Sequence, residues 1–234
     1  MATLRILSGG AAQAVVEKIA EEFRRETGHE ISGEFSAVGA MRDKVLAGEA
    51  ADVVILTAAL IDELAVTGHV VAGSRTDLGK VGTGVAVRAG TPLPEVSNPE
   101  ALRGNLLAAA KILCPDPAVA TAGKVVMRMT ELLGIADQVR GKMQFFPNGY
   151  AAMKYLAASS GSLEMGITQV TEILPNAGVK LAGQLPDALQ MKAVYSAGLG
   201  ARAANADVAK AFIARLVAPG ARPVLAAGGY ELAA

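Results

Sequence analysis

The sequence is poor in several residue types, and each shortage excludes a class of protein. Its 234 residues include one cysteine, two histidines and no tryptophan. The single cysteine, Cys114, cannot form an intramolecular disulfide and does not identify a cellular compartment. No spacing of cysteine and histidine is typical of a metal site, and no glycine-rich loop matches a nucleotide-binding motif. We therefore expect no metal and no cofactor.

Charge and hydrophobic runs exclude two further kinds of partner. Lysine plus arginine and aspartate plus glutamate both number 22, so the formal net charge is zero. The sequence has no basic run of the kind that binds a phosphate backbone, and we expect no nucleic acid partner. No apolar stretch reaches the roughly 18 residues that a membrane span needs.

The first residues, Met1 to Leu7, follow a strand pattern almost at once. A secretory leader would show a basic start, an apolar run and a small-residue cleavage site, and none is visible. We therefore expect a cytoplasmic protein from the sequence as written, or a periplasmic one if a leader has been removed.

Strands and helices alternate along the chain, which predicts an α/β protein with mostly parallel sheets flanked by helices. Apolar residues make up 52% of the sequence, enough for two cores. Strands are expected at residues 4–7, 31–35, 52–56, 85–87, 112–114, 143–146, 165–168, 179–181 and 191–199. Helices are expected at residues 11–27, 41–47, 59–67, 123–133, 150–158 and 206–217, with a further helix beginning at Asn98 and Pro99.

Local signals support several of these boundaries. Glycines 28, 48, 68 and 134 stand where helices should end in the left-handed conformation. Asn98 and Asn205 stand where side chains should cap helix starts. Asp52 opens a strand, and we expect its side chain to fix a local turn, whereas Cys114 should be a buried strand residue.

The order of elements suggests two lobes. The chain completes one α/β unit near residue 83, builds a second, and returns near residues 190 to 196. We expect lobe 1 to contain residues 1–83 plus 196–234 and lobe 2 to contain residues 84–195. Two crossover segments would then form a hinge, with a cleft between the lobes.

Several segments resemble the molybdate-binding proteins of ABC transporters, which have the type II periplasmic-binding-protein fold. One of them is residues 46–55, in which the run from Ala47 to Ile55, AGEAADVVI, is the most specific. Others occur in the same order at residues 20–23, 26–28, 35–36, 116–123, 166–167 and 228–230. The resemblance covers nearly the whole chain. It implies a solute-binding protein that closes on a small anion in the interlobe cleft, with a transporter permease as a possible partner.

The resemblance also implies which residues contact the ligand. Backbone amides at helix N-termini and a few hydroxyls hold the anion in that family, because such amides are unpaired and the helix dipole favours negative charge. From the positions that match the family's binding loops, and from side chains near the expected cleft, we expect twelve residues to contact the ligand. They are Gly9, Gly10, Ala11, Ser36, Ala37, Val38, Arg42, Thr121, Ala122, Asn148, Tyr150 and Gln169.

Three of these positions depart from the family pattern. Ala11 and Val38 stand where the family carries serines, and Gln169 stands where it carries a tyrosine. Hydrogen bonds to charged groups contribute roughly 1.5–3 kcal/mol each, so the loss of two weakens oxyanion binding strongly. Val38 also adds apolar volume. A small organic carboxylate therefore fits the sequence better than molybdate.

Two alternatives remain open. Aconitate isomerase resembles the same family, and a cytoplasmic isomerase acting on a di- or tricarboxylate would use the same cleft. Such an enzyme needs a base near the carbon acid. Arg42, Lys124, Tyr150 and Asp116 are candidates for its site, although the sequence does not assign the base. A sensory ligand-binding module without a transporter is the other alternative.

Overall fold

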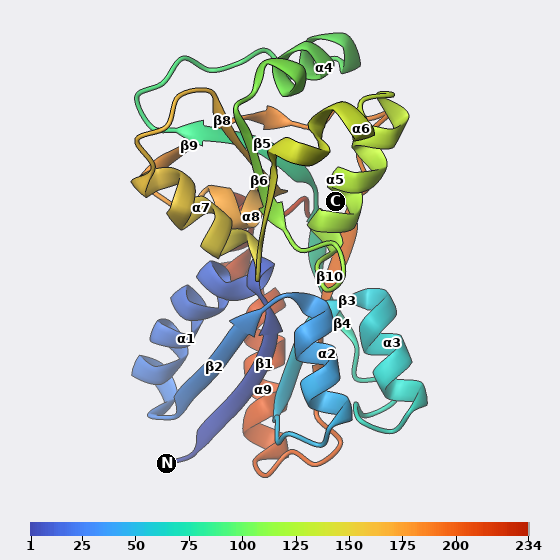
Figure 1. The fold of residues 1–234 in the computed structure, drawn as a ribbon. Coiled ribbons are helices and arrows are strands. Elements are labelled where there is room, and N and C mark those ends of the chain that lie inside the picture. Colours follow the sequence, from blue (N-terminus) through green and yellow to red (C-terminus); the bar gives the residue numbers. More distant parts are fainter. Residues whose placement is uncertain (234) are drawn as a thin grey trace. The chain divides into compact units, whose positions relative to one another are not determined.

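The alternating strands and helices form two separate sheets, each in its own compact unit (Figure 1). The computed structural model describes residues 1–233. Unit 1 contains Met1–Val81 and the chain from Ala193 onward, and unit 2 contains Gly82–Lys192. The chain thus leaves unit 1 once and returns to it once.

The sheet of unit 1 has the strand order β2-β1-β3-β10-β4. These strands are β1 (Thr3–Gly9), β2 (Glu30–Ser36), β3 (Val53–Thr57), β4 (Thr76–Val81) and β10 (Ala193–Leu199). β1 pairs in parallel with β2 and β3, whereas β10 is antiparallel to both β3 and β4. β10 therefore runs against the other four strands, and the sheet is mostly parallel.

Helices cover both faces of this sheet. α1 (Gln13–Thr27) packs with α9 (Ala206–Val217) and α10 (Arg222–Ala227), which follows the short helix η3 (Pro219–Ala221). α2 (Val38–Leu46) and α3 (Ala58–Val66) lie side by side against β3 (Figure 1). Phe212 of α9 is fully buried and meets Phe23 of α1 edge to face, with ring centroids 5.3 Å apart. This contact joins the two longest helices of unit 1.

The sheet of unit 2 has the strand order β7-β6-β8-β5-β9. These strands are β5 (Thr83–Arg88), β6 (Lys111–Pro115), β7 (Met143–Phe146), β8 (Glu164–Gln169) and β9 (Val179–Gln184). β6 pairs in parallel with β7 and β8, and β5 is antiparallel to β8 and β9. β5 is therefore antiparallel to the other four strands of this sheet.

Two apolar clusters fill the two faces of the second sheet. One gathers residues of α4 (Pro99–Ala108), α5 (Thr121–Leu132) and α6 (Ala136–Val139), which precedes the short helix η2 (Arg140–Lys142). The other gathers residues of α7 (Gly149–Ala158) and α8 (Val170–Ile173). Cys114 is fully buried in the first cluster, as predicted. The sheet thus separates α5 from α7, and both helices begin at its carboxyl edge.

Most helix boundaries follow the local signals, with one exception. Glycines 28, 48, 68 and 134 all adopt positive φ angles between 66° and 87°, as predicted. The Asn98 side chain caps α4 by accepting a hydrogen bond from Ala101 N at 2.9 Å. The prediction for Asn205 was wrong, because its side chain makes no capping hydrogen bond to α9.

Asp52 fixes tertiary structure and not the local turn we expected. Its carboxylate accepts hydrogen bonds from Arg5 N at 2.8 Å and from Asn205 N at 3.2 Å. These partners are 47 and 153 residues away in the sequence, so Asp52 ties β1 and the segment before α9 to the start of β3. The expectation of a local role was therefore wrong.

Two kinds of feature are absent from residues 1–233. No helix there is both long enough and apolar enough to cross a membrane. Within the same residues, no group of three or more His, Cys, Asp or Glu side chains is placed to hold a metal ion.

Candidate functional site

Six of the predicted site residues lie together at the carboxyl edge of the first sheet. β1 and β2 end in register, with Gly9 opposite Ser36. The chain then continues from Gly9 into the short helix η1 (Gly10–Ala12), which leads directly into α1, and from Ser36 through Ala37 into α2. The parallel register therefore gathers residues 9–11 and 36–38, which are separated by 25 residues or more along the chain.

Gly9 is required at this point by packing. A Cβ atom at Gly9 would lie 2.7 Å from Val38 Cγ1 and 3.1 Å from Tyr195 Cε1. Val38 of α2 and Tyr195 of β10 therefore press against the backbone of the first turn. Both side chains are buried, with 6% and 3% of their surface exposed. The apolar side of this edge is thus built by residues from three different elements.

Three helix starts at this edge lack a side-chain cap. Gly9, Ala37 and Thr57 are the capping residues of η1, α2 and α3, and all three have extended backbone with φ between −60° and −67°. None makes a side-chain hydrogen bond to its helix. The first amides of a helix have no acceptor within the helix, so these starts can donate to an external anion.

The hydroxyl groups near these turns are mostly engaged within the protein. Ser8 is fully buried, and its Oγ donates to Gly9 O at 3.0 Å. Tyr230 Oη donates to Ala11 O at 3.1 Å. Ser36 is half-buried at the end of β2. The edge thus offers backbone amides, one half-buried serine and the apolar side chains of Ala11 and Val38.

Arg42 lies further along α2 and is engaged by its neighbour in the sequence. Its Nε and Nη2 atoms donate to Asp43 Oδ1 at 2.9 and 2.7 Å. This hydrogen bond raises the pKa of the guanidinium. A ligand carboxylate would therefore have to compete with Asp43 for the Arg42 guanidinium.

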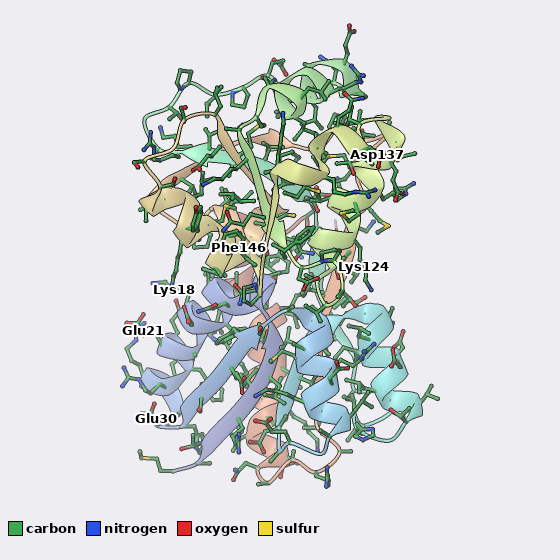
Figure 2. The ribbon with its side chains drawn as sticks, in the orientation of Figure 1. Lys18, Glu21, Glu30, Lys124, Asp137 and Phe146 are labelled. Atoms are coloured by element: carbon green, nitrogen blue, oxygen red, sulfur yellow. The ribbon has the colours of Figure 1, made fainter. Side chains whose placement is uncertain are left out.

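The second sheet has a corresponding edge in unit 2. β6 and β7 end in register, with Pro115 opposite Phe146, and Asp116 N donates to Phe146 O at 2.8 Å. Figure 2 labels Phe146 at the end of β7 and Lys124 in the first turns of α5. The loops that lead into α5, α7 and α8 therefore begin at the same edge of the sheet.

The start of α5 is uncapped, like the starts in unit 1. Asp116 turns the chain, because its Oδ1 accepts from Ala118 N at 2.8 Å and its carbonyl oxygen accepts from Ala120 N at 2.9 Å. The capping residue of α5 is Ala120, which has no side-chain acceptor to offer. The amides of residues 121–123 thus begin a 12-residue helix without an internal side-chain partner.

The start of α7 is different, because acidic and amide side chains occupy it. Asn148 Oδ1 accepts from Ala151 N at 2.9 Å, and Glu172 Oε1 accepts from Gly149 N at 3.2 Å. Two amides of the first turn therefore have internal acceptors. The predicted contact residues Asn148 and Tyr150 lie at this edge, but their helix start offers fewer free donors than that of α5.

Glu172 is a buried carboxyl group that the sequence did not single out. Its Oε2 accepts from Thr168 Oγ1 at 2.5 Å, in addition to the bond from Gly149 N. Burial raises the pKa of Glu172 to about 7, and hydrogen bonds from Thr168 and from the N–H groups of Gly149 and Gln169 oppose this rise. No basic side chain contributes to this pKa, and Glu172 has no salt bridge within residues 1–233.

Gln169 occupies the carboxyl end of β8. Only 3% of its surface is exposed, and its Oε1 atom has no hydrogen-bond partner within the described residues. It is also the capping residue of α8, although its side chain does not cap that helix. The position therefore presents a buried acceptor that the protein does not satisfy.

Sequence reasoning missed three residues at these two edges. Thr57 and Tyr195 stand at the same level of the first sheet, since they pair directly between β3 and β10. Thr57 could have been predicted, because it directly follows the third predicted strand, as the other expected contact residues follow theirs. Nothing in the sequence marks Tyr195 or Glu172, because their places depend on an antiparallel return strand and on a four-residue helix.

One cavity of unit 2 lies away from this edge. It has a volume of about 440 Å³ and is lined mostly by apolar side chains, together with Arg88 at the end of β5 and Glu164 at the start of β8. Because β8 runs from Glu164 to Gln169, the cavity lies at the opposite end of this strand from Gln169. It contains none of the predicted contact residues.

Comparisons with known proteins identify one matching family model and one curated relative. The model of the bacterial extracellular solute-binding protein family matches residues 4–231. An aconitate isomerase from Pseudomonas sp is 25% identical over 237 residues, which cover 98% of this chain and 87% of that protein.

Solved structures share the fold. The periplasmic molybdate-binding protein of Azotobacter vinelandii superposes with a TM-score of 0.84 at 20% identity, covering 99% of this chain and all of the other. The sulfate-binding protein of Mycobacterium tuberculosis H37Rv gives a TM-score of 0.78 at 15% identity, covering 98% and 86% of the two chains. Two lobes with helix-flanked mixed sheets are the type II periplasmic-binding-protein fold, as the sequence predicted. The chain belongs to the family of bacterial extracellular solute-binding proteins.

Proposed function

We propose that the chain is a solute-binding protein that binds a small anion at uncapped helix starts. The observation that carries this proposal is that the starts after β1, β2 and β6 have no side-chain cap, whereas Asn98 and Asn148 cap helices elsewhere in the same chain. Uncapped starts at the carboxyl ends of parallel strands are favourable anion sites, because their amides are unpaired and carry partial positive charge.

We further propose that the anion is a small organic carboxylate and not molybdate or sulfate. A compact dianion needs many donors around it, and the two positions expected to carry serines are Ala11 and Val38, both buried. The Ser8 hydroxyl, near the end of β1, is engaged with Gly9 O. A carboxylate needs fewer donors, and its carbon skeleton can pack against Val38.

The family description also supports a place of action and a partner. Members are described as extracellular solute-binding proteins, and two structural relatives are named as substrate-binding parts of ABC transporters. We propose that this chain acts outside the cytoplasm and delivers its ligand to a transporter permease.

A ligand screen tests the carboxylate proposal. Thermal unfolding is followed with succinate, malate, citrate, molybdate and sulfate, each from micromolar to millimolar concentration. We expect one or more carboxylates to raise the melting temperature and molybdate to leave it nearly unchanged. A rise above about 5 °C with micromolar molybdate would contradict the proposal, since it corresponds to roughly 1 kcal/mol or more of binding energy.

Val38 offers a sharper test within the same site. Val38→Thr is close to isosteric and adds one hydroxyl beside Gly9. We expect this variant to bind molybdate at least about 10-fold more tightly than the unchanged protein, because a hydrogen bond to a charged group contributes roughly 1.5–3 kcal/mol. Val45→Thr is the matched control, since Val45 is buried in the same helix away from the helix start. It should lose stability without gaining molybdate affinity.

A second candidate function is an isomerase acting on a di- or tricarboxylate. It is favoured by the relative named aconitate isomerase, which aligns with 98% of this chain. It is also favoured by Glu172, a buried carboxyl with a pKa raised to about 7 at the edge that carries Asn148 and Gln169. Incubation with cis- or trans-aconitate, followed by ultraviolet absorbance, tests this activity. No change at high protein concentration would eliminate it.

A further inference from the structure

Gln169 carries an unsatisfied hydrogen-bond acceptor that needs an explanation. Its side chain is 97% buried, and Oε1 has no donor within reach among residues 1–233. Buried polar atoms in native proteins nearly always have a partner, because an unpaired acceptor in a low-dielectric interior is costly. The residue ends β8 at the edge where α5 begins, so a ligand bound at that edge can supply the missing donor.

Strand geometry places this acceptor on the α5 side of the sheet. Successive side chains of a strand point to opposite faces. Thr168 points toward α8, where it donates to Glu172. Ile167 belongs to the apolar cluster that includes Val125 of α5, and Gln169 follows Ile167 by two residues. Gln169 therefore shares the face of Ile167, which α5 covers.

The α5 side of this edge thus combines two complementary features. The first turn of α5 offers amides without a side-chain cap, and these donate hydrogen bonds. Gln169 Oε1 is an acceptor that has no donor among residues 1–233. Fully ionised molybdate, sulfate and simple carboxylates carry acceptors only, so they satisfy the amides and leave Gln169 unpaired. A hydroxyl group on the ligand satisfies Gln169 as well.

We propose that the ligand is a hydroxycarboxylate, whose carboxylate accepts hydrogen bonds from the first amides of α5 and whose hydroxyl donates to Gln169 Oε1. This inference rests on the proposed anion-binding function and narrows its ligand class. Glu164 Oε2 is another buried acceptor without a partner, but it lies at the far end of β8, and its carboxylate is paired with Lys111 at 3.0 Å. Thr171 Oγ1 is the third such atom, but it is a hydroxyl and can itself donate to an anion, whereas Gln169 Oε1 only accepts. We therefore assign recognition of the ligand hydroxyl to Gln169.

Matched ligand pairs test the proposal by isothermal titration calorimetry. Malate is compared with succinate, citrate with tricarballylate, and lactate with propionate, since each pair differs by one hydroxyl. We expect the hydroxylated member of the best-binding pair to bind about 10- to 100-fold more tightly. If both members of a pair bind equally well, the hydroxycarboxylate proposal fails while the anion-binding function stands. If no carboxylate binds, both fail.

Two variants test whether Gln169 causes the preference for the hydroxylated ligand. Gln169→Leu removes the acceptor, and we expect the ratio of affinities within the pair to fall to about one. Gln184→Leu is the matched control, because Gln184 ends β9 on the other side of β5 and is exposed. It should keep the ratio of the unchanged protein. A Gln169→Leu protein that keeps the hydroxyl preference overturns the assignment, and if this variant does not fold, the ligand pairs on the unchanged protein decide.

Discussion

Glu172 makes a prediction about stability that does not depend on any ligand. Its carboxyl is buried with no basic partner among residues 1–233, and burial raises its pKa from 4.5 to about 7. The native state therefore holds this proton at pH values where the unfolded chain has released it. Stability that depends on a protonated Glu172 is complete below about pH 4.5 and is lost as the pH rises to about 7.

The pKa shift sets the size of the effect. A rise from 4.5 to about 7 corresponds to about 3 kcal/mol of unfolding free energy between the two ends of that pH range. Glu172→Gln removes the titration while keeping an oxygen that can accept from Gly149 N. The unchanged protein should therefore lose about 2–3 kcal/mol relative to the variant between pH 5 and pH 8.

Urea unfolding at pH 5, 6, 7 and 8 measures this difference. Glu131→Gln is the control, because Glu131 is exposed on α5 and should leave the pH dependence unchanged. Parallel curves for the unchanged protein and Glu172→Gln would refute the reasoning, since they would mean that Glu172 titrates alike in the folded and unfolded chain.

Two further predictions concern helix capping by asparagine and the reactivity of Cys114. Asn98→Ala should lower the unfolding free energy by about 1 kcal/mol in a urea titration, because the Asn98 side chain caps α4 through Ala101 N. Asn205→Ala should cost clearly less, since the Asn205 side chain makes no capping bond, and an equal cost would contradict this reading. Cys114 should not react with Ellman's reagent in the native protein, because burial and the nearby Asp116 raise its pKa to about 12. Rapid reaction without denaturant would show that β6 opens more readily than its burial implies.

The sequence predicted the regular elements well where local patterns dominate. Helix ends at Gly28 and Gly134 follow from the left-handed conformation that glycine adopts easily. β4 was missed because its residues, Thr76–Val81, include an aspartate, a glycine and a lysine and do not alternate clearly. This strand lies at the sheet edge, where Lys80 exchanges backbone hydrogen bonds with Glu231. Its stability comes from a distant segment, which local patterns do not reveal.

Some residues of the candidate site could be predicted from local sequence patterns, and others could not. The turns at Gly9 and Ser36 follow strands that the sequence predicts, so their position at one sheet edge could be anticipated. Glu172 could not, because a glutamate in a polar segment usually faces solvent. Its burial depends on Gly149, where a side chain would collide with the carboxylate. Gly149 and Glu172 come into contact only because the sheet brings the starts of α7 and α8 together.

A crystal structure with the best-binding carboxylate tests the central claim most directly. We predict that the ligand carboxylate accepts hydrogen bonds from the first amides of α2 or α5, and that its hydroxyl lies within hydrogen-bond distance of Gln169 Oε1. A ligand bound in the cavity lined by Arg88 and Glu164, away from these helix starts, would contradict the account.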